Sequence, residues 1–165
     1  MREIVIPSPR INNDNLRGYS YHDGIARYAL PEALNKGGIN PTSHPNAVDL
    51  CAGGGSWARL LVDNGWEESN LTCIDRLKSL TPLVPRAKWL YWDLEKLSMA
   101  LLLGEPLPAE VVSLRYKLDM VFCFYSPLRM TEEQTVCEFL IRHGGHVFNQ
   151  KSPSGKSISP WISSS

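Results

Sequence analysis

A glycine cluster and three acidic residues are the parts of this sequence whose types and spacing suit ligand chemistry. In the stretch AVDLCAGGGSW, residues 47–57, an apolar segment containing Asp49 leads into three consecutive glycines and then Trp57. Asp75 ends the apolar segment LTCID, and Asp93 follows the segment KWLYW. Glycines between a strand and a helix let the backbone turn tightly and let a ligand approach it closely. The pattern predicts a binding site for a nucleotide-like ligand.

The loop lacks the sequence signatures of a phosphate site. The dinucleotide fingerprint G-x-G-x-x-G is absent, because Cys51 and Ser56 stand where glycines are needed. The phosphate loop that ends in Gly-Lys-Ser/Thr is also absent here, and the GKS at 155–157 lies too near the terminus to open a helix. A nicotinamide-dependent oxidoreductase is therefore a weak hypothesis.

Three carboxylates at strand ends suit a neutral or cationic adenosine ligand better than a pyrophosphate. A carboxylate at Asp75 can accept hydrogen bonds from a ribose diol, and one at Asp93 can accept from an adenine amino group. S-adenosylmethionine (SAM) fits this description and is the expected cofactor. The alternative for each acid is a helix N-cap or a solvated turn.

Apolar segments alternate with helical patterns along the chain. This alternation predicts an α/β fold, with a Rossmann-like, mostly parallel sheet covered by helices on both faces and shortened at the C-terminus. Ligands of such sheets bind beyond the carboxyl ends of the strands, where the three acids are expected. Strands are predicted at 46–51, 71–75, 88–94, 118–127 and 146–150, and helices at 23–36, 56–65, 94–104 and 131–145.

The length of 165 residues suits one domain with one core. We expect an irregular N-terminal arm at 1–18, a Rossmann-like SAM-binding domain at 19–152 and a Ser-rich tail at 153–165. There is no run long enough to span a bilayer and no signal peptide, so we expect a cytoplasmic or nuclear location without membrane contact.

The net charge and the cysteine content limit which partners and metal sites are expected for this chain. The formal net charge is zero, which argues against a broad nucleic-acid footprint but leaves room for a local patch. Four cysteines without a C-x-x-C pair predict buried thiols rather than disulfides or zinc ligands, and no metal site is expected. A modest basic cluster is either that patch or an ordinary solvated surface; it comprises Arg76, Lys78, Arg86, Lys88 and Lys96.

The motifs AVDLCAGGGSW, LTCID and YWDL resemble those of class I SAM-dependent methyltransferases, specifically the FtsJ-like RNA 2′-O-methyltransferases. The resemblance runs from about residue 47 to 151 and includes a Gly and a Trp at the spacing of Gly55 and Trp57. It implies SAM as cofactor and RNA as acceptor, although Trp57 is equally suited to packing. The implied cofactor contacts are Asp49, Cys51, Ala52, Gly53, Gly54, Gly55, Trp57, Asp75, Asp93, Leu94 and Phe124.

The catalytic part of the family pattern is degenerate here. The family uses a Lys-Asp-Lys-Glu tetrad, and Phe124 stands at the position of its Asp. Gln150 stands where the second lysine belongs, with Lys151 one residue later, so only a β-bulge would bring Lys151 into place. No lysine precedes residue 36, and Arg27 is the nearest cation to the first position. Lys151 and Arg27 are the candidate catalytic residues.

Two hypotheses follow for the function. The first is an FtsJ-like SAM-dependent methyltransferase that acts on RNA, and we lean toward this enzyme. The alternative is a catalytically inactive SAM-binding or fold-retaining module that acts through a partner. The chain ends soon after its last predicted strand, so the family's final hairpin is missing. The sheet edge is then expected to be exposed, where a protein partner or a second copy of the chain could pair.

Overall fold

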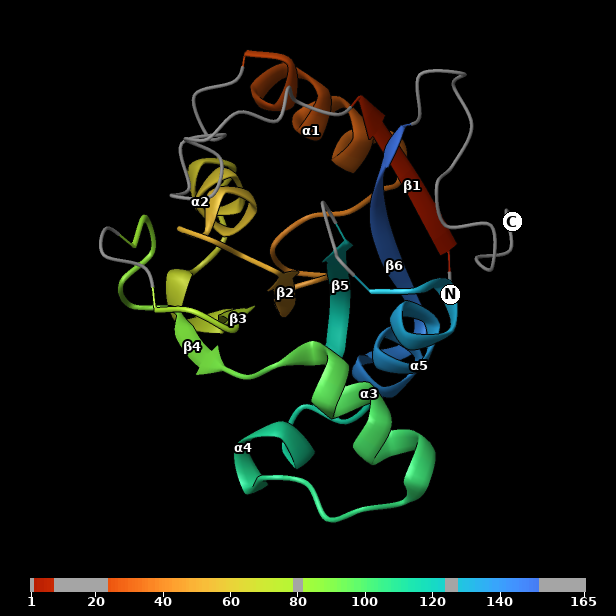
Figure 1. Ribbon diagram of the computed structural model, residues 1–165. Helices are drawn as coiled ribbons and strands as arrows, with labels where there is room; N and C mark the ends of the chain where they lie inside the picture. Colours follow the sequence, from red (N-terminus) through yellow and green to blue (C-terminus); the bar gives the residue numbers. More distant parts are fainter. Residues whose placement is uncertain (1, 8–23, 79–81, 124–127, 152–165) are drawn as a thin grey trace.

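The computed structural model describes residues 2–7, 24–78, 82–123 and 128–151. These residues form a six-stranded sheet in the order β1-β6-β5-β2-β3-β4, in which every neighbouring pair is parallel (Figure 1). The predicted α/β class with a mostly parallel sheet is confirmed. The elements are β1 (Arg2–Pro7), α1 (Gly24–Lys36), β2 (Ala47–Leu50), α2 (Ser56–Asp63), η3 (Glu68–Asn70), β3 (Leu71–Asp75), β4 (Lys88–Tyr91), α3 (Leu94–Leu103), α4 (Ala109–Val112), β5 (Leu118–Cys123), α5 (Met130–Leu140) and β6 (Ile141–Lys151).

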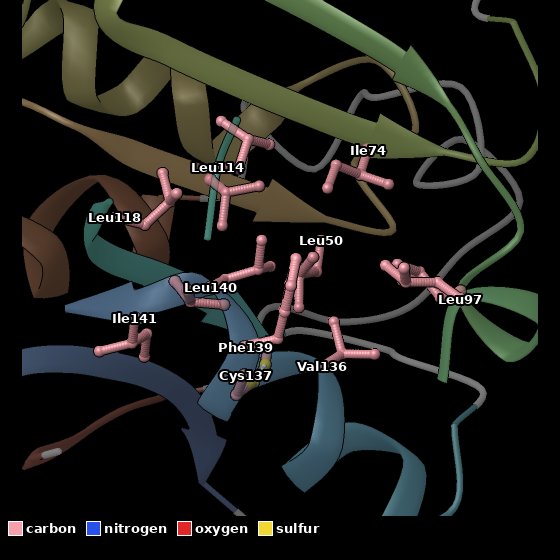
Figure 2. Close-up of a cluster of buried hydrophobic side chains, with 14 of the residues drawn as sticks. Leu50, Ile74, Leu97, Leu114, Leu118, Val136, Cys137, Phe139, Leu140 and Ile141 are labelled. Carbon is pink, nitrogen blue, oxygen red and sulfur yellow. Dashed lines mark hydrogen bonds between the residues drawn. The ribbon is translucent and has the colours of Figure 1, made fainter. Parts of the chain in front are cut away.

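The core has two layers, one on each face of the sheet. Strand β5 contributes side chains to both layers. Met120 and Phe122 belong to the layer under α1 and α2. Val121 and Cys123 belong to the layer under α3 and α5. This alternation is the period of two that a strand imposes on its side chains. Figure 2 shows the second layer, where side chains of α3, α5 and the strands interlock. Helices therefore cover both faces, as the sequence predicts.

The last helix is shorter than predicted. A helix was expected over 131–145, but α5 ends at Leu140 and β6 begins at Ile141. The pairing of β5 with β6 shifts register between Leu118 and Met120, so the extra residues of β6 lie opposite this shift. A Cβ on Gly145 would lie 2.5 Å from Ile141 Cγ2 and 3.1 Å from the Asp119 carbonyl oxygen. Glycine is needed for this irregular strand, not for a helix end.

The N-terminal arm was expected to be irregular over 1–18, and this is wrong for residues 2–7. They form β1, which pairs with β6 from Arg2 opposite His146 to Pro7 opposite Lys151. The segment is rich in the β-branched residues that favour strands, and Ile4 packs against the core. Strand β1 therefore covers the edge of β6 that was expected to be exposed. Residues 8–18 and the tail at 153–165 lie outside the described residues.

Among the described helices, none combines the length and the apolarity that a membrane-spanning segment requires. The described residues also contain no group of three or more His, Cys, Asp or Glu side chains arranged to hold a metal ion. The four cysteines form no disulfide, and Cys73, Cys123 and Cys137 are buried. The prediction of buried thiols is confirmed for these three.

Deleting residues 1–7 tests the role of β1. Without this strand the edge of β6 keeps unpaired N–H and C=O groups, which pair readily with another chain. The truncated protein should melt at a lower temperature and self-associate, as measured by scanning calorimetry and by light scattering after gel filtration. A truncated monomer with an unchanged melting temperature would show that β1 contributes nothing to the sheet.

Candidate functional site

The glycine loop, residues 51–55, links the carboxyl end of β2 to the start of α2. Its backbone is left-handed at Cys51 (φ 54°), Gly53 (φ 57°) and Gly55 (φ 89°). The loop is tied to β3 because the Ala52 N–H donates to the Ile74 carbonyl at 3.0 Å. A non-glycine residue with positive φ, such as Cys51, is uncommon and marks a tightly constrained turn.

Gly55 is required by packing. A Cβ at this position would lie 2.9 Å from Val84 Cγ2 and 3.4 Å from both Cys73 Sγ and Trp89 Cη2. The same neighbouring segment donates a hydrogen bond from the Leu83 N–H to the Gly54 carbonyl at 2.8 Å. Gly54 and Gly55 are both buried. Residues 82–84 therefore lie on the loop, and the space beside Gly55 is filled by protein.

Asp75 closes the glycine loop from the end of β3. Its Oδ2 accepts a hydrogen bond from the Gly53 N–H at 2.8 Å, and its Oδ1 accepts from the Leu77 N–H at 2.9 Å. The side chain is partly exposed, and each carboxylate oxygen has a second lone pair for another donor. Asp75 can therefore hold the loop and still accept a hydrogen bond from a ligand.

Asp49 lies in the interior, beneath the start of α2. It is 4% exposed, and its Oδ2 accepts from the Ala58 N–H at 3.3 Å. Burial raises the pKa of Asp49 to about 8, against the lowering effect of hydrogen bonds from the Ala58 and Trp57 backbones. The structure thus places this predicted cofactor contact as an acceptor for the first turn of α2.

The N–H groups of this region are largely used within the protein. The Gly53 N–H donates to Asp75, and the Gly55 N–H donates to the Ala52 carbonyl. In the first turn of α2, two backbone N–H groups donate to Asp49. A phosphate site needs such groups pointing at the ligand. A ligand at this loop would therefore meet carboxylates that accept hydrogen bonds and a backbone at Gly53 that it can approach closely. It would find few N–H donors for an anionic group.

Asp93 is the N-cap of α3 and does not end a strand. β4 stops at Tyr91, and Asp93 Oδ1 accepts from the Glu95 N–H at 2.9 Å and the Lys96 N–H at 3.4 Å. The alternative of a helix N-cap is what the structure shows. Its Oδ2 has no hydrogen-bond partner among the described residues, and the side chain is partly exposed. Leu94, the next predicted contact, is 6% exposed in the core.

Trp57 is a core residue. It is 6% exposed and its ring stacks on Phe122 with centroids 5.5 Å apart, while Phe122 stacks on Phe148 at 4.4 Å. The packing role that the sequence left open is therefore the one observed. Such a buried aromatic stack fixes the start of α2 against β5 and β6.

The candidate catalytic residues come from opposite ends of the chain. Arg27 is exposed on α1, and Lys151 is the last residue of β6. The backbone register with β1 is regular from His146 to Lys151, and the one shift in the β5–β6 pairing lies at the opposite end of β6. No bulge therefore moves Lys151 to the place of Gln150. Phe124 lies outside the described residues.

Sequence reasoning missed Trp92, which directly precedes Asp93. Its indole N–H is buried and has no hydrogen-bond partner among the described residues. An unpaired buried N–H costs free energy, and such groups gather at functional or strained sites. Nothing in the sequence distinguishes this tryptophan from one that only packs; a buried, unpaired donor becomes visible only in the structure.

Two solved structures resemble this chain, and the first of them supports the fold. A solved structure described as a SAM-dependent methyltransferase from Archaeoglobus fulgidus superposes with a TM-score of 0.52 at 13% identity, over 86% of this chain and 60% of that one. This chain thus spans 60% of the length of that protein. A Corynebacterium glutamicum protein superposes with a TM-score of 0.45 at 17% identity, over 82% of this chain and 72% of that one. No protein-family model and no curated protein matches the sequence.

Gly55→Ala tests the packing of the loop, with Gly38→Ala as a matched control. Both glycines have positive φ, but a Cβ on Gly38 would meet nothing within 4 Å. The control should lose about 1 kcal/mol of unfolding free energy from backbone strain alone. Gly55→Ala should lose about 2–4 kcal/mol because it adds the clash with Val84. Denaturant titration measures both, and equal losses would show that the loop is not packed as described.

Asp49→Asn tests the buried carboxyl. Because the pKa of Asp49 is raised to about 8 in the folded state, its contribution to stability is fully present below the unfolded pKa of about 3.9 and is lost as the pH rises through about 8. Relative to the variant, which keeps an acceptor oxygen, the wild-type unfolding free energy should fall by up to about 1.4 kcal/mol per pH unit between these limits. Denaturant titrations across pH 4–9 measure the difference. Parallel pH curves would contradict a buried, titrating Asp49.

Proposed function

We propose that this chain binds SAM at the carboxyl ends of β2, β3 and β4 and transfers its methyl group to RNA. The observation that carries the proposal is a set of carboxylates around a glycine loop whose N–H groups are largely used within the protein. SAM brings a cationic sulfonium, an ammonium group and an uncharged adenosine, and it carries no phosphate. The Archaeoglobus neighbour, described as a SAM-dependent methyltransferase, supports the same reading.

The described residues fit this cofactor. Asp75 would accept hydrogen bonds from the ribose hydroxyls through its remaining lone pairs. Asp93 Oδ2, which has no partner among the described residues, would accept from the adenine amino group. Gly53, which is partly exposed, leaves the backbone open to close approach. When bound, SAM supplies an electrophilic methyl group on sulfur. The negative field of the two acids favours a cationic ligand over an anionic one.

The acceptor half of the proposal rests on the resemblance to FtsJ-like enzymes, which implies a ribose 2′-hydroxyl. Arg27 is exposed and permanently charged, so its role would be to orient the acceptor and not to remove its proton. Lys151 is the lysine nearest in sequence to the tetrad position and is kept as the candidate for handling that proton, although the register of β6 does not bring it to the place of Gln150. The exposed basic residues that follow β3, flank or begin β4 and lie in α3 would meet RNA phosphates; they are Arg76, Lys78, Arg86, Lys88 and Lys96.

A catalytically inactive relative is the second candidate. The resemblance puts Gln150 at the position of a tetrad lysine and Phe124 at that of the tetrad Asp, and the pairing of β6 with β1 is regular from His146 to Lys151. A phenyl ring cannot accept a hydrogen bond or balance the charge of a lysine. In this alternative the chain binds SAM, or only keeps the fold, and acts through a binding partner.

Asp93→Asn, compared with Asp93→Ala, tests the cofactor site. Asparagine caps helices as well as aspartate, so the Asn variant should keep the stability that the Ala variant loses, about 1 kcal/mol. In Asp93→Asn the side-chain oxygen is used by the helix cap, so the amide N–H groups face the adenine amino group. Both groups are then donors and cannot form a hydrogen bond with each other. Calorimetric titration should show SAM affinity at least about tenfold weaker for both variants. Unchanged SAM affinity in Asp93→Asn would show that Asp93 serves only as a helix cap.

Methyl transfer distinguishes the two candidate functions. Incubation with methyl-labelled SAM and bulk RNA should label the RNA, and both Asp93→Asn and Lys151→Ala should lower the labelling. Nuclease digestion and mass spectrometry locate the methyl group on the ribose or on a base. SAM binding without transfer to any RNA would favour the inactive relative.

A further inference from the structure

Two buried thiols lie in contact between β5 and α5. Cys123 ends β5 and Cys137 lies in the middle of α5, with their sulfur atoms 3.3 Å apart. They are 1% and 0% exposed. Figure 2 shows Cys137 within the cluster that also contains Leu50 and Val136. The proposed methyl transfer uses neither thiol.

We propose that Cys123 and Cys137 are an oxidative modification site, which closes to an intramolecular disulfide in the presence of a small-molecule disulfide. One protein thiolate attacks the oxidant and forms a mixed disulfide, releasing one reduced thiol. The second protein thiolate then attacks the protein sulfur and releases the other. Two protein thiols lose their protons and two electrons, and the oxidant becomes two thiols.

The geometry favours this pair because the sulfurs need to approach by only about 1.3 Å to reach bonding distance. Both residues lie within regular secondary structure, and both belong to the core layer on the same face of the sheet. Cys73 belongs to the core layer on the opposite face and cannot compete. Cys51 is the competitor, since it follows Leu50, the register partner of Cys123, and is partly exposed.

The environment makes the reaction slow. The hydrogen bond with Cys137 and burial both raise the pKa of the Cys123 thiol, so little thiolate is present near neutral pH. Oxidation therefore requires α5 to move off the sheet transiently. We expect the partly exposed Cys51 to form mixed disulfides first, and the Cys123–Cys137 bond to accumulate more slowly.

The bond would fasten α5 to the carboxyl end of β5. This end directly precedes residue 124, where the resemblance places a residue of the catalytic tetrad. The disulfide would therefore hold α5 against the part of the sheet where the methyl acceptor is expected to bind. The chemistry itself does not depend on the proposed function, because no step involves SAM or RNA.

The test is oxidation of the folded protein with glutathione disulfide, followed by peptide mapping under non-reducing conditions. The expected product links the peptides of Cys123 and Cys137, and dithiothreitol reverses it. Closing this loop should raise the melting temperature by roughly 5–10 °C. Cys73→Ala should form the same link at the same rate, whereas Cys137→Ala should not form it.

Mapping of the unsubstituted chain keeps the test decisive if Cys137→Ala fails to fold. A link between Cys51 and Cys123 would overturn the proposal, as would mixed disulfides with no internal link. Appearance of the Cys123–Cys137 link only at the rate of global unfolding, measured in the same buffer, would also overturn it. Cys51→Ser removes the competing thiol and should leave the expected link in place.

Discussion

The closeness of Val84 to the backbone of Gly55 is the constraint on which the candidate site depends. A methyl group of Val84 occupies the space where any other residue at position 55 would carry its Cβ. With the loop held there, the Gly53 N–H meets Asp75 and α2 begins at Ser56. Trp57 then reaches its stack on Phe122. One packing contact thus sets the backbone of the loop, the direction of an acid and the start of a helix.

The acids of the site have different roles because their surroundings differ. Asp49 is buried, and its raised pKa reflects the cost of ionising a carboxyl away from water. Asp75 and Asp93 are partly exposed, and each is oriented by backbone N–H groups. Asp49 therefore supports the first turn of α2 from below, while the other two keep acceptors for a ligand. The proposal of an adenosine ligand without phosphate rests on this division.

The sequence was sufficient for the features that depend on local pattern. The strand at 71–75, the glycine loop and the helix after it were predicted because apolar period and glycine content are local signals. Strand β1 was missed because its pairing partner, β6, lies about 140 residues away in the chain. Whether Trp57 packs or binds is decided by tertiary contacts that no local pattern contains. The cap at Asp93 is local, since its acceptor meets the N–H groups of Glu95 and Lys96.

The most direct test of the central claim, that the loop is built for a phosphate-free adenosine ligand, is calorimetric titration of the chain with SAM and, separately, with NAD⁺. We expect saturable binding of SAM and no binding of NAD⁺ at the same concentrations. Binding of NAD⁺ but not of SAM would contradict it, because the loop would then have N–H groups for a pyrophosphate. Binding of neither by the folded chain would show that the loop serves only the packing of the fold.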